Sequence, residues 1–262
     1  MILWLIASAA LIYTAICVVV YFYQEKMMFF PEKLPQSFHF NFSTPFVELD
    51  YLTSDETTIN ALLFKVDNTK GIVFYSHGNA GSLQGWGSVA EQFTMLGFDC
   101  LVYDYRCFGK STGKLSEDGI FQDAQYIYQK LAEEYGEDKI IVYGRSMGSG
   151  VATYVASQND PAMLILETPF YSGKDLAHKW YPWLPTFLLR YNFRTDQYLP
   201  KVKCPIYLIH GTDDEVVYYG SSLKLEKLLK AGDKFFTIDG GHHNDLSHFL
   251  EFQEGLKQIL HK

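Results

Sequence analysis

The sequence predicts an α/β fold, in which a mostly parallel sheet of about eight strands carries helices on both faces. The first observation is alternation, because short apolar runs that suit strands are followed repeatedly by longer helical patterns. The second is that some of these runs, such as 71–76, are apolar almost throughout, which is typical of strands buried on both faces. The third is length, since 262 residues are enough for one large domain of this kind.

The individual elements follow from these patterns in chain order. Residues 46–52 and 58–66 are predicted to form an opening antiparallel pair of strands. The helix at Glu117–Tyr135 has apolar residues on one face, and Gly136 ends it. Further strands are expected at 71–76, 98–103, 139–143, 163–166, 205–209 and 234–238. Further helices are expected at 89–96, 147–157, 221–229 and 245–260.

The N-terminal segment is predicted to anchor the chain in a membrane. Ile2 to Tyr23 is a run of 22 residues without a formal charge, long enough to cross a bilayer as a helix. A cleaved signal peptide is the alternative, but the run lacks a basic start and exceeds the usual apolar core of such a peptide. We therefore expect an anchor at 1–24, a connector at 25–45 and an α/β domain at 46–262. Lys26 and Lys33 follow the span, which favours a cytoplasmic domain.

Composition excludes some function classes. A net charge of −8 and the lack of a Lys/Arg cluster argue against a nucleic-acid partner. Hydrophobic residues make up 48% of the chain and aromatic residues 16%, which leaves apolar surface for a pocket or a membrane. The four cysteines lack the spacing of a zinc site, and a disulfide framework is not expected.

A serine between two glycines joins a predicted strand to a predicted helix. The strand at 139–143 is followed by Gly-x-Ser-x-Gly, in which Ser146 lies between Gly144 and Gly148. Such a turn holds the seryl oxygen above the edge of a sheet. The glycines are needed because a Cβ at either position would collide with the neighbouring strand or helix. Ser146 is therefore the candidate nucleophile.

A nucleophilic serine needs a base and an acid that orients the base, in the chain order Ser, acid, His. The acid is expected in the loop after the strand at 205–209, where Asp213, Asp214 and Glu215 compete. We choose Asp214, because it fits the hydrolase pattern His-Gly-x-x-Asp-x-x-Val. The alternative is an acidic turn whose side chains are solvated.

The base is expected in the loop after the strand at 234–238, where His242 and His243 are adjacent. Two adjacent side chains cannot both face the site. We choose His243, because the matching pattern is two small residues, one variable residue and then His-Asn-Asp. His77 and His210 each begin a His-Gly pair at a strand end, and both are interpreted as structural members of their turns.

Acyl transfer also requires two hydrogen-bond donors for the oxyanion of the tetrahedral intermediate. One is expected to be the backbone N–H of Met147, directly after the nucleophile. The other is expected from the glycine-rich loop at 77–81, with Asn79 preferred over Ala80.

Taken together, these landmarks resemble the α/β-hydrolase superfamily, and in particular its membrane-anchored "alpha/beta-hydrolase domain-containing" proteins. The landmarks are the N-terminal anchor, Ser76–Gly81, Tyr103–Arg106, Gly144–Gly148, Glu167–Phe170, the Asp214 motif and Gly240–Asp245. The resemblance implies a Ser146, Asp214 and His243 triad that uses neither a metal nor an organic cofactor. One departure is Cys107, which stands where the family has a glycine.

The substrate is expected to contact the segment near 170–200, where this fold inserts a cap over the nucleophile. The cap is rich in aromatic residues, including Trp180 and Trp183, which indicates an apolar lid that touches the bilayer. Plain packing of a helical insertion is the alternative. We expect a serine hydrolase that acts on a small or lipid-like ester or thioester with a hydrophobic acyl group. A serine peptidase and a catalytically silent membrane-tethered binding protein are the rival hypotheses, and the oligomeric state stays open.

Overall fold

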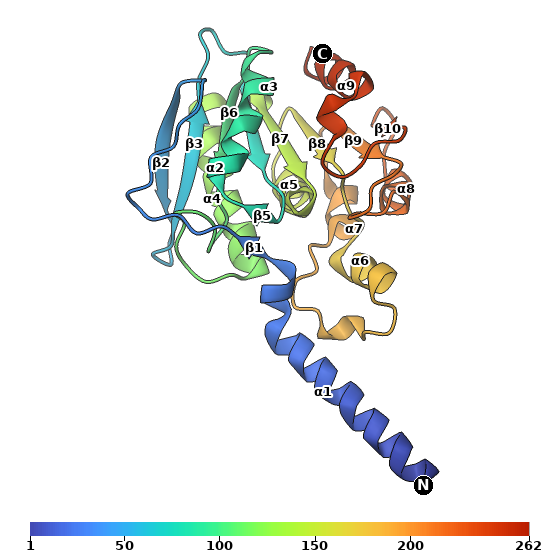
Figure 1. Ribbon diagram of the computed structural model, residues 1–262. Helices are drawn as coiled ribbons and strands as arrows, with labels where there is room; N and C mark the ends of the chain where they lie inside the picture. The colour runs from blue at the N-terminus through green and yellow to red at the C-terminus, as the bar shows by residue number, and fades with distance from the viewer. Residues whose placement is uncertain (262) are drawn as a thin grey trace.

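The structure is a computed structural model that describes residues 1–261. Its main strands are β2 (Phe46–Leu52), β3 (Thr58–Phe64), β4 (Ile72–Ser76), β6 (Asp99–Tyr103), β7 (Ile140–Arg145), β8 (Met163–Glu167), β9 (Ile206–Gly211) and β10 (Lys234–Ile238). They form an eight-stranded sheet in the order β10-β9-β8-β7-β4-β6-β3-β2 (Figure 1). Strand β3 is antiparallel to both β2 and β6, and the other pairs are parallel. The predicted mostly parallel sheet is confirmed.

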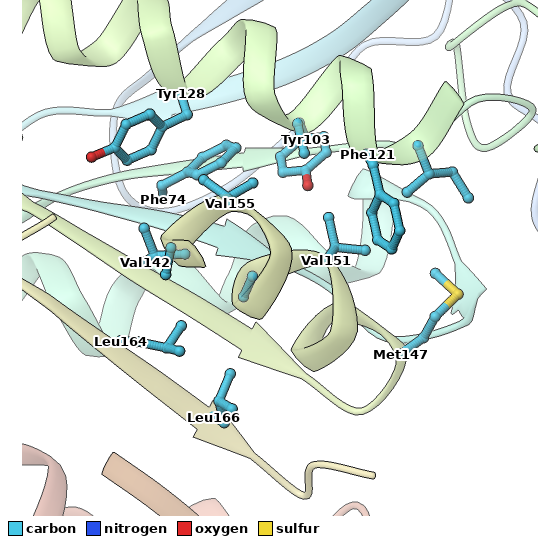
Figure 2. Packing of buried hydrophobic residues seen from close by; sticks show 14 of the residues in the cluster. Phe74, Tyr103, Phe121, Tyr128, Val142, Met147, Val151, Val155, Leu164 and Leu166 are labelled. Carbon is cyan, nitrogen blue, oxygen red and sulfur yellow. The ribbon is translucent and has the colours of Figure 1, made fainter. Parts of the chain in front are cut away.

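The helices are α1 (Ile2–Met28), α2 (Leu83–Trp86), α3 (Ala90–Thr94), α4 (Glu117–Tyr135), α5 (Met147–Gln158), α6 (Gly173–Trp180), α7 (Thr195–Tyr198), α8 (Gly220–Glu226) and α9 (Leu250–Leu260). Helices α4, α5 and α8 contribute to the apolar core on one face of the sheet, and α2, α3 and α9 contribute to the core on the other. Both cores exist because alternate side chains of each strand point to opposite faces. Figure 2 shows the first core, where Val151 and Val155 of α5 pack with Phe74, Val142 and Leu164 of the sheet.

Several element boundaries differ from the predictions, and at two of them a side chain takes over a backbone partner. Strand β3 ends at Phe64 rather than at residue 66, because the N–H of Val66 donates to Asp99 Oδ1 at 2.8 Å. The last helix begins at Leu250 rather than at residue 245. The carboxylate of Asp245 accepts from the N–H of His242 at 2.7 Å, and residues 246–248 form a separate 3₁₀ turn.

Between β8 and β9 the chain leaves the sheet and forms a small helical cap. The cap consists of α6, a 3₁₀ turn at Thr186–Leu188, α7 and a second 3₁₀ turn at Leu199–Lys201. Ser172 caps the N-terminus of α6, because its hydroxyl accepts from the N–H of Asp175. The cap begins where β8 ends, and residues of α6 line the same cavity as Ser146, so this part of the cap lies over the carboxyl ends of the central strands.

Helix α1 projects away from the rest of the molecule (Figure 1). Within residues 1–261 it is the helix whose length and composition suit a membrane span, as an anchor or as a signal sequence. The helix continues past the apolar run to Met28, because polar residues in its last turns find partners in the cap. The first residues of the predicted connector are therefore helical. Beyond α1, the short strands β1 (Phe30–Pro31) and β5 (Ala80–Gly81) pair in parallel.

Candidate active site

Ser146 lies at the turn between β7 and α5. Its backbone has φ 51° and ψ −120°, a conformation that non-glycine residues rarely adopt and that marks a strained turn. The turn is held by a hydrogen bond of 2.9 Å from the N–H of Ser146 to the carbonyl of Glu167. A Cβ at Gly144 would overlap α5, and a Cβ at Gly148 would overlap the carbonyl of Ser76. Both glycines are therefore needed sterically, as predicted.

The structure brings Ser146, His243 and Asp214 together at the carboxyl ends of β7, β10 and β9. Ser146 Oγ lies 3.0 Å from His243 Nε2, and His243 Nδ1 lies 2.8 Å from Asp214 Oδ2. These are hydrogen-bond distances in the order that a base and its orienting acid require. Ser146 is half-buried at the protein surface, whereas His243 and Asp214 are buried.

The competing residues lie elsewhere. His242 is more than half exposed and contacts Glu215, with Nδ1 at 3.1 Å from Oε2. Asp213 accepts a hydrogen bond of 3.1 Å from the hydroxyl of Thr212. The structure thus brings Asp214 and His243, which the motif patterns favour, together with Ser146, whereas Asp213, Glu215 and His242 have other partners.

The carboxylate of Asp214 is saturated with donors. Oδ1 accepts from the N–H groups of Val216 and Val217 at 2.8 and 2.7 Å, and Oδ2 faces His243 and His210. Burial by itself would raise the pKa of Asp214, but the hydrogen bonds from His210 and His243 outweigh burial. The pKa of Asp214 therefore lies below its usual range, and the group stays ionised at neutral pH.

His210 has a part in the site that sequence reasoning missed. It was interpreted as a structural member of its turn, yet its Nε2 lies 3.0 Å from Asp214 Oδ2 and 2.8 Å from the carbonyl of Val217. Its Nδ1 lies 2.5 Å from Ser222 Oγ. His210 thus contacts the same carboxylate oxygen as His243 and helps to fix the orientation of Asp214. His210 and Asp214 are four residues apart in the sequence, but only the turn after β9 brings their side chains into contact.

Arg145 is a second residue that the sequence did not single out. It fills the first variable position of Gly-x-Ser-x-Gly and forms an ion pair with Glu167, with Nε 3.1 Å from Oε1. Its guanidinium also donates to the carbonyl of His243 at 3.0 Å. Arg145 therefore joins the nucleophile turn to the loop that carries the base.

The two expected oxyanion donors lie beside Ser146. Met147 opens α5, so its N–H belongs to the first turn, whose amides have no partner within the helix. The loop with Asn79 passes close to the nucleophile, because a Cβ built on Gly78 would be 3.8 Å from Ser146 Cβ. Asn79 and Met147 both line the cavity above Ser146, whereas Ala80 is exposed and pairs with Phe30.

Cys107 departs from the family pattern, but its backbone has a conformation that a glycine would adopt. Its φ is 67°, the left-handed conformation that a glycine adopts without strain. Its thiol lies 3.1 Å from the carbonyl of Gly113. The loop that follows β6 therefore has a glycine-like backbone with a cysteine side chain.

An apolar cavity of about 320 Å³ opens above Ser146. On the side of the nucleophile it is lined by Ser146, Met147 and Asn79. Its walls come from the cap, the loop after β9 and, unexpectedly, the end of α1, with Val20, Gln24, Leu176, Trp180, Leu184, Phe193 and Val217 among the lining residues. The cap therefore covers the candidate nucleophile with mainly apolar side chains.

Comparison with known proteins places the chain in a family. Residues 67–195 match the sequence model of a family described as serine aminopeptidase, S33. Alpha/beta hydrolase domain-containing protein aho-3 of Caenorhabditis elegans is 33% identical over 199 residues, which are 74% of this chain and 58% of that protein. Alpha/beta hydrolase domain-containing protein 17B of Xenopus tropicalis is 30% identical over 74% of this chain and 67% of its own length. The chain belongs to the family of alpha/beta hydrolase domain-containing proteins.

The matched segment spans about 60% of the length of the first relatives, 58% for aho-3 and 61% for protein 17C of Xenopus tropicalis. Solved structures agree on the fold. An esterase of Pyrococcus furiosus is 20% identical and superposes with a TM-score of 0.71, covering 89% of this chain and 97% of the esterase. A soluble variant of monoglyceride lipase from Saccharomyces cerevisiae is 17% identical, with a TM-score of 0.65 over 86% of this chain and 98% of the lipase.

Proposed function

We propose that this protein is a serine hydrolase that cleaves an acyl ester or thioester with a hydrophobic acyl group. The observation that carries the proposal is the chain of contacts from Ser146 through His243 to Asp214 at the floor of an apolar cavity. A strained serine with a base at 3.0 Å is of no use to a protein that only binds. This argues against the silent binding protein.

The mechanism follows from the geometry. His243 accepts the proton of Ser146 as Oγ attacks the carbonyl carbon, and Asp214 stabilises the imidazolium that forms. The N–H groups of Met147 and Asn79 donate to the oxyanion of the tetrahedral intermediate. The alcohol or thiol leaves with the proton from His243. Water, activated by the same histidine, then releases the acid from Ser146.

A peptidase is the second candidate, because the matching family is described as a serine aminopeptidase. An aminopeptidase has to bind the charged amino terminus of a peptide, and a buried ammonium needs a carboxylate partner. Among residues 1–261, those that line the cavity above Ser146 include no Asp, Glu, Lys or Arg. The lining therefore favours an uncharged acyl group over a peptide terminus.

We further propose that α1 is an uncleaved membrane anchor, with the domain on the cytoplasmic side. Cleavage after Tyr23 would remove Tyr13 and Val20, which contact the cap and line the cavity. It would also leave Gln24, which is 2% exposed and contacts the cap backbone, without the helix that positions it. The lysines at 26 and 33 support the orientation. The intact mass of the membrane-bound protein tests the anchor, and a mass that lacks the N-terminal segment would contradict it.

The test of function is labelling of the full-length chain with a fluorophosphonate, together with turnover of p-nitrophenyl esters of increasing chain length. Ser146→Ala is expected to abolish labelling and to lower ester turnover by about 10³-fold or more, because it removes the attacking oxygen. Ser157→Ala is the matched control, since Ser157 lies near the other end of α5, where its hydroxyl donates to the carbonyl of Tyr154 and accepts from Gln158 Nε2. Labelling that survives in Ser146→Ala would rule out Ser146 as the nucleophile.

A further inference from the structure

Helix α1 does more than extend from the domain, because its last turns form part of the cavity above Ser146. Val20, Gln24, Met27 and Met28 of α1 line the same cavity as Ser146 and Met147. These positions recur at intervals of three or four, so one face of the helix is turned toward the cavity. The remaining faces are different, since Val19 is 55% exposed and Phe22 69%.

The cap is attached to α1 along several helical turns. Tyr13 Oη donates to the carbonyl of Trp183 at 2.9 Å. Further along, Gln24 Nε2 donates to the carbonyl of Leu188 at 3.1 Å, and Gln24 Oε1 accepts from the N–H of Arg190 at 2.8 Å. At a rise of about 1.5 Å per residue, these two contacts are separated by about 16 Å along the helix axis. The cap tip therefore runs beside α1 rather than merely touching its end.

The polar contacts at the end of α1 fix the helix to both the cap and the loop of Asn79. Glu25 contacts Arg190 and accepts from Tyr191 Oη. Asn79 Nδ2 donates to the carbonyl of Met28, at the last residue of α1. The helix thus holds a set position against the cap on one side and against the loop beside Ser146 on the other.

The outer surface of the cap tip is aromatic and exposed. Tyr181 is 52% exposed, Trp183 53% and Phe187 79%. This tip lies at the level of the apolar run of α1, as the contact of Tyr13 with Trp183 shows. Tryptophan and tyrosine are enriched where a membrane meets water, and exposed aromatic residues there favour burial among lipid chains. Insertion of α1 into a bilayer therefore also brings the cap tip into the bilayer.

We infer that the acyl chain of the substrate reaches Ser146 directly from the bilayer, through the cavity between α1 and the cap. In this arrangement α1 is one wall of the acyl site, and the substrate is a long-chain acyl ester or thioester that resides in the membrane. The inference rests on the proposed function, since it concerns the same cavity. An apolar chain that moves from lipid into this cavity stays in apolar surroundings throughout, without transfer through water.

The first test narrows the cavity from the side of α1. Full-length protein is reconstituted in phosphatidylcholine vesicles, and the ratio of p-nitrophenyl palmitate to p-nitrophenyl butyrate turnover is measured. Val20→Trp is expected to lower this ratio at least tenfold, because its ring would occupy the path of the long chain. Val19→Trp is the matched control: it adds the same ring one residue away, on the exposed face, and is expected to leave the ratio as in wild type.

The outcomes separate the two proposals. An unchanged ratio in Val20→Trp, or an equal loss in Val19→Trp, would overturn the role of α1 as a wall. Wild-type protein that hydrolyses neither ester would instead overturn the proposed function.

The second test needs no substitution. A long-chain ester that exchanges slowly between vesicles is placed either in the vesicles that carry the wild-type protein or in separate protein-free vesicles. Entry from the bilayer predicts turnover that is at least tenfold faster when enzyme and ester share a membrane. Equal rates in the two arrangements would show that the substrate arrives through water and would overturn the inference.

Discussion

The floor and the walls of the cavity are built in contrasting ways. By the floor we mean Ser146, which lines the cavity, together with His243 and Asp214 behind it. Each of the three follows a strand of the central sheet, and hydrogen bonds of 3.0 and 2.8 Å join them. The walls consist of the cap and α1, which lie outside the sheet and carry exposed aromatic residues such as Trp183 and Phe187. Their contacts with each other are a small set of polar bonds between apolar surfaces.

The floor and the walls are suited to two different tasks, catalysis and acceptance of the acyl chain. Catalysis needs atoms held within a few tenths of an ångström, and adjacent parallel strands whose ends are fixed by the ladder supply this. Acceptance of a flexible acyl chain needs an apolar surface but little angular precision, so segments outside the ladder suffice. We therefore expect substitutions in the floor to reduce turnover of all substrates, and substitutions in the walls to change which substrates are accepted.

The largest expected effect comes from the acid of the floor. Asp214→Asn keeps the size of the side chain but removes the charge that orients and stabilises His243, so kcat is expected to fall by about 10³ to 10⁴-fold. The measurement is steady-state hydrolysis of a short-chain ester. Asp213→Asn is the control, because Asp213 contacts Thr212 rather than His243. A loss confined to long-chain esters would contradict the distinction between floor and walls.

The next effect concerns a buried ion pair outside both the floor and the walls. Arg106 follows β6 and is buried with Asp123, with Nε 2.5 Å from Oδ2, and it also contacts Asp55 at 2.7 Å. Arg106→Met leaves Asp123 buried without its partner and is expected to cost about 3–5 kcal/mol of unfolding free energy, measured by chemical denaturation. The matched variant Lys65→Met breaks the half-exposed pair with Glu134 and should cost less than about 1 kcal/mol. Equal costs would mean that burial of the Arg106 pair does not govern its contribution.

The smallest effect is expected at the cap tip. Phe187 is 79% exposed, so Phe187→Ser is expected to change the unfolding free energy by about 0.5 kcal/mol or less in detergent solution. Phe93 is fully buried against the sheet, and the same change there, Phe93→Ser, should cost about 3–5 kcal/mol because it leaves a cavity and buries a hydroxyl. The losses of stability in the two variants are compared by thermal unfolding. A large loss of stability in Phe187→Ser would show that the cap tip belongs to the folding core.

Motif and periodicity together were enough to predict the fold and the residues of the floor. The strand at 139–143 and its Gly-x-Ser-x-Gly turn could be predicted from the sequence, because a turn of this kind is a local feature whose glycines are required sterically. Asp214 and His243 could be chosen because each follows a strand, and the ends of parallel strands meet at one edge of the sheet. The role of Arg145 could not be predicted, since its side chain reaches the loop of His243. The role of His210 could not be predicted either, since it depends on the turn after β9, which brings Asp214 back against it.

The sequence by itself therefore determined an α/β-hydrolase domain, a Gly-x-Ser-x-Gly turn with an acid and a histidine in the expected order, and an apolar N-terminal helix. These features are local or periodic, so a short stretch of sequence is enough to predict each of them. Only the tertiary structure decided that α1 and the cap enclose one cavity with Ser146. Residues as distant in sequence as Tyr13 and Trp183 are brought together by the cap's path out of the sheet, and no spacing within the chain encodes that contact.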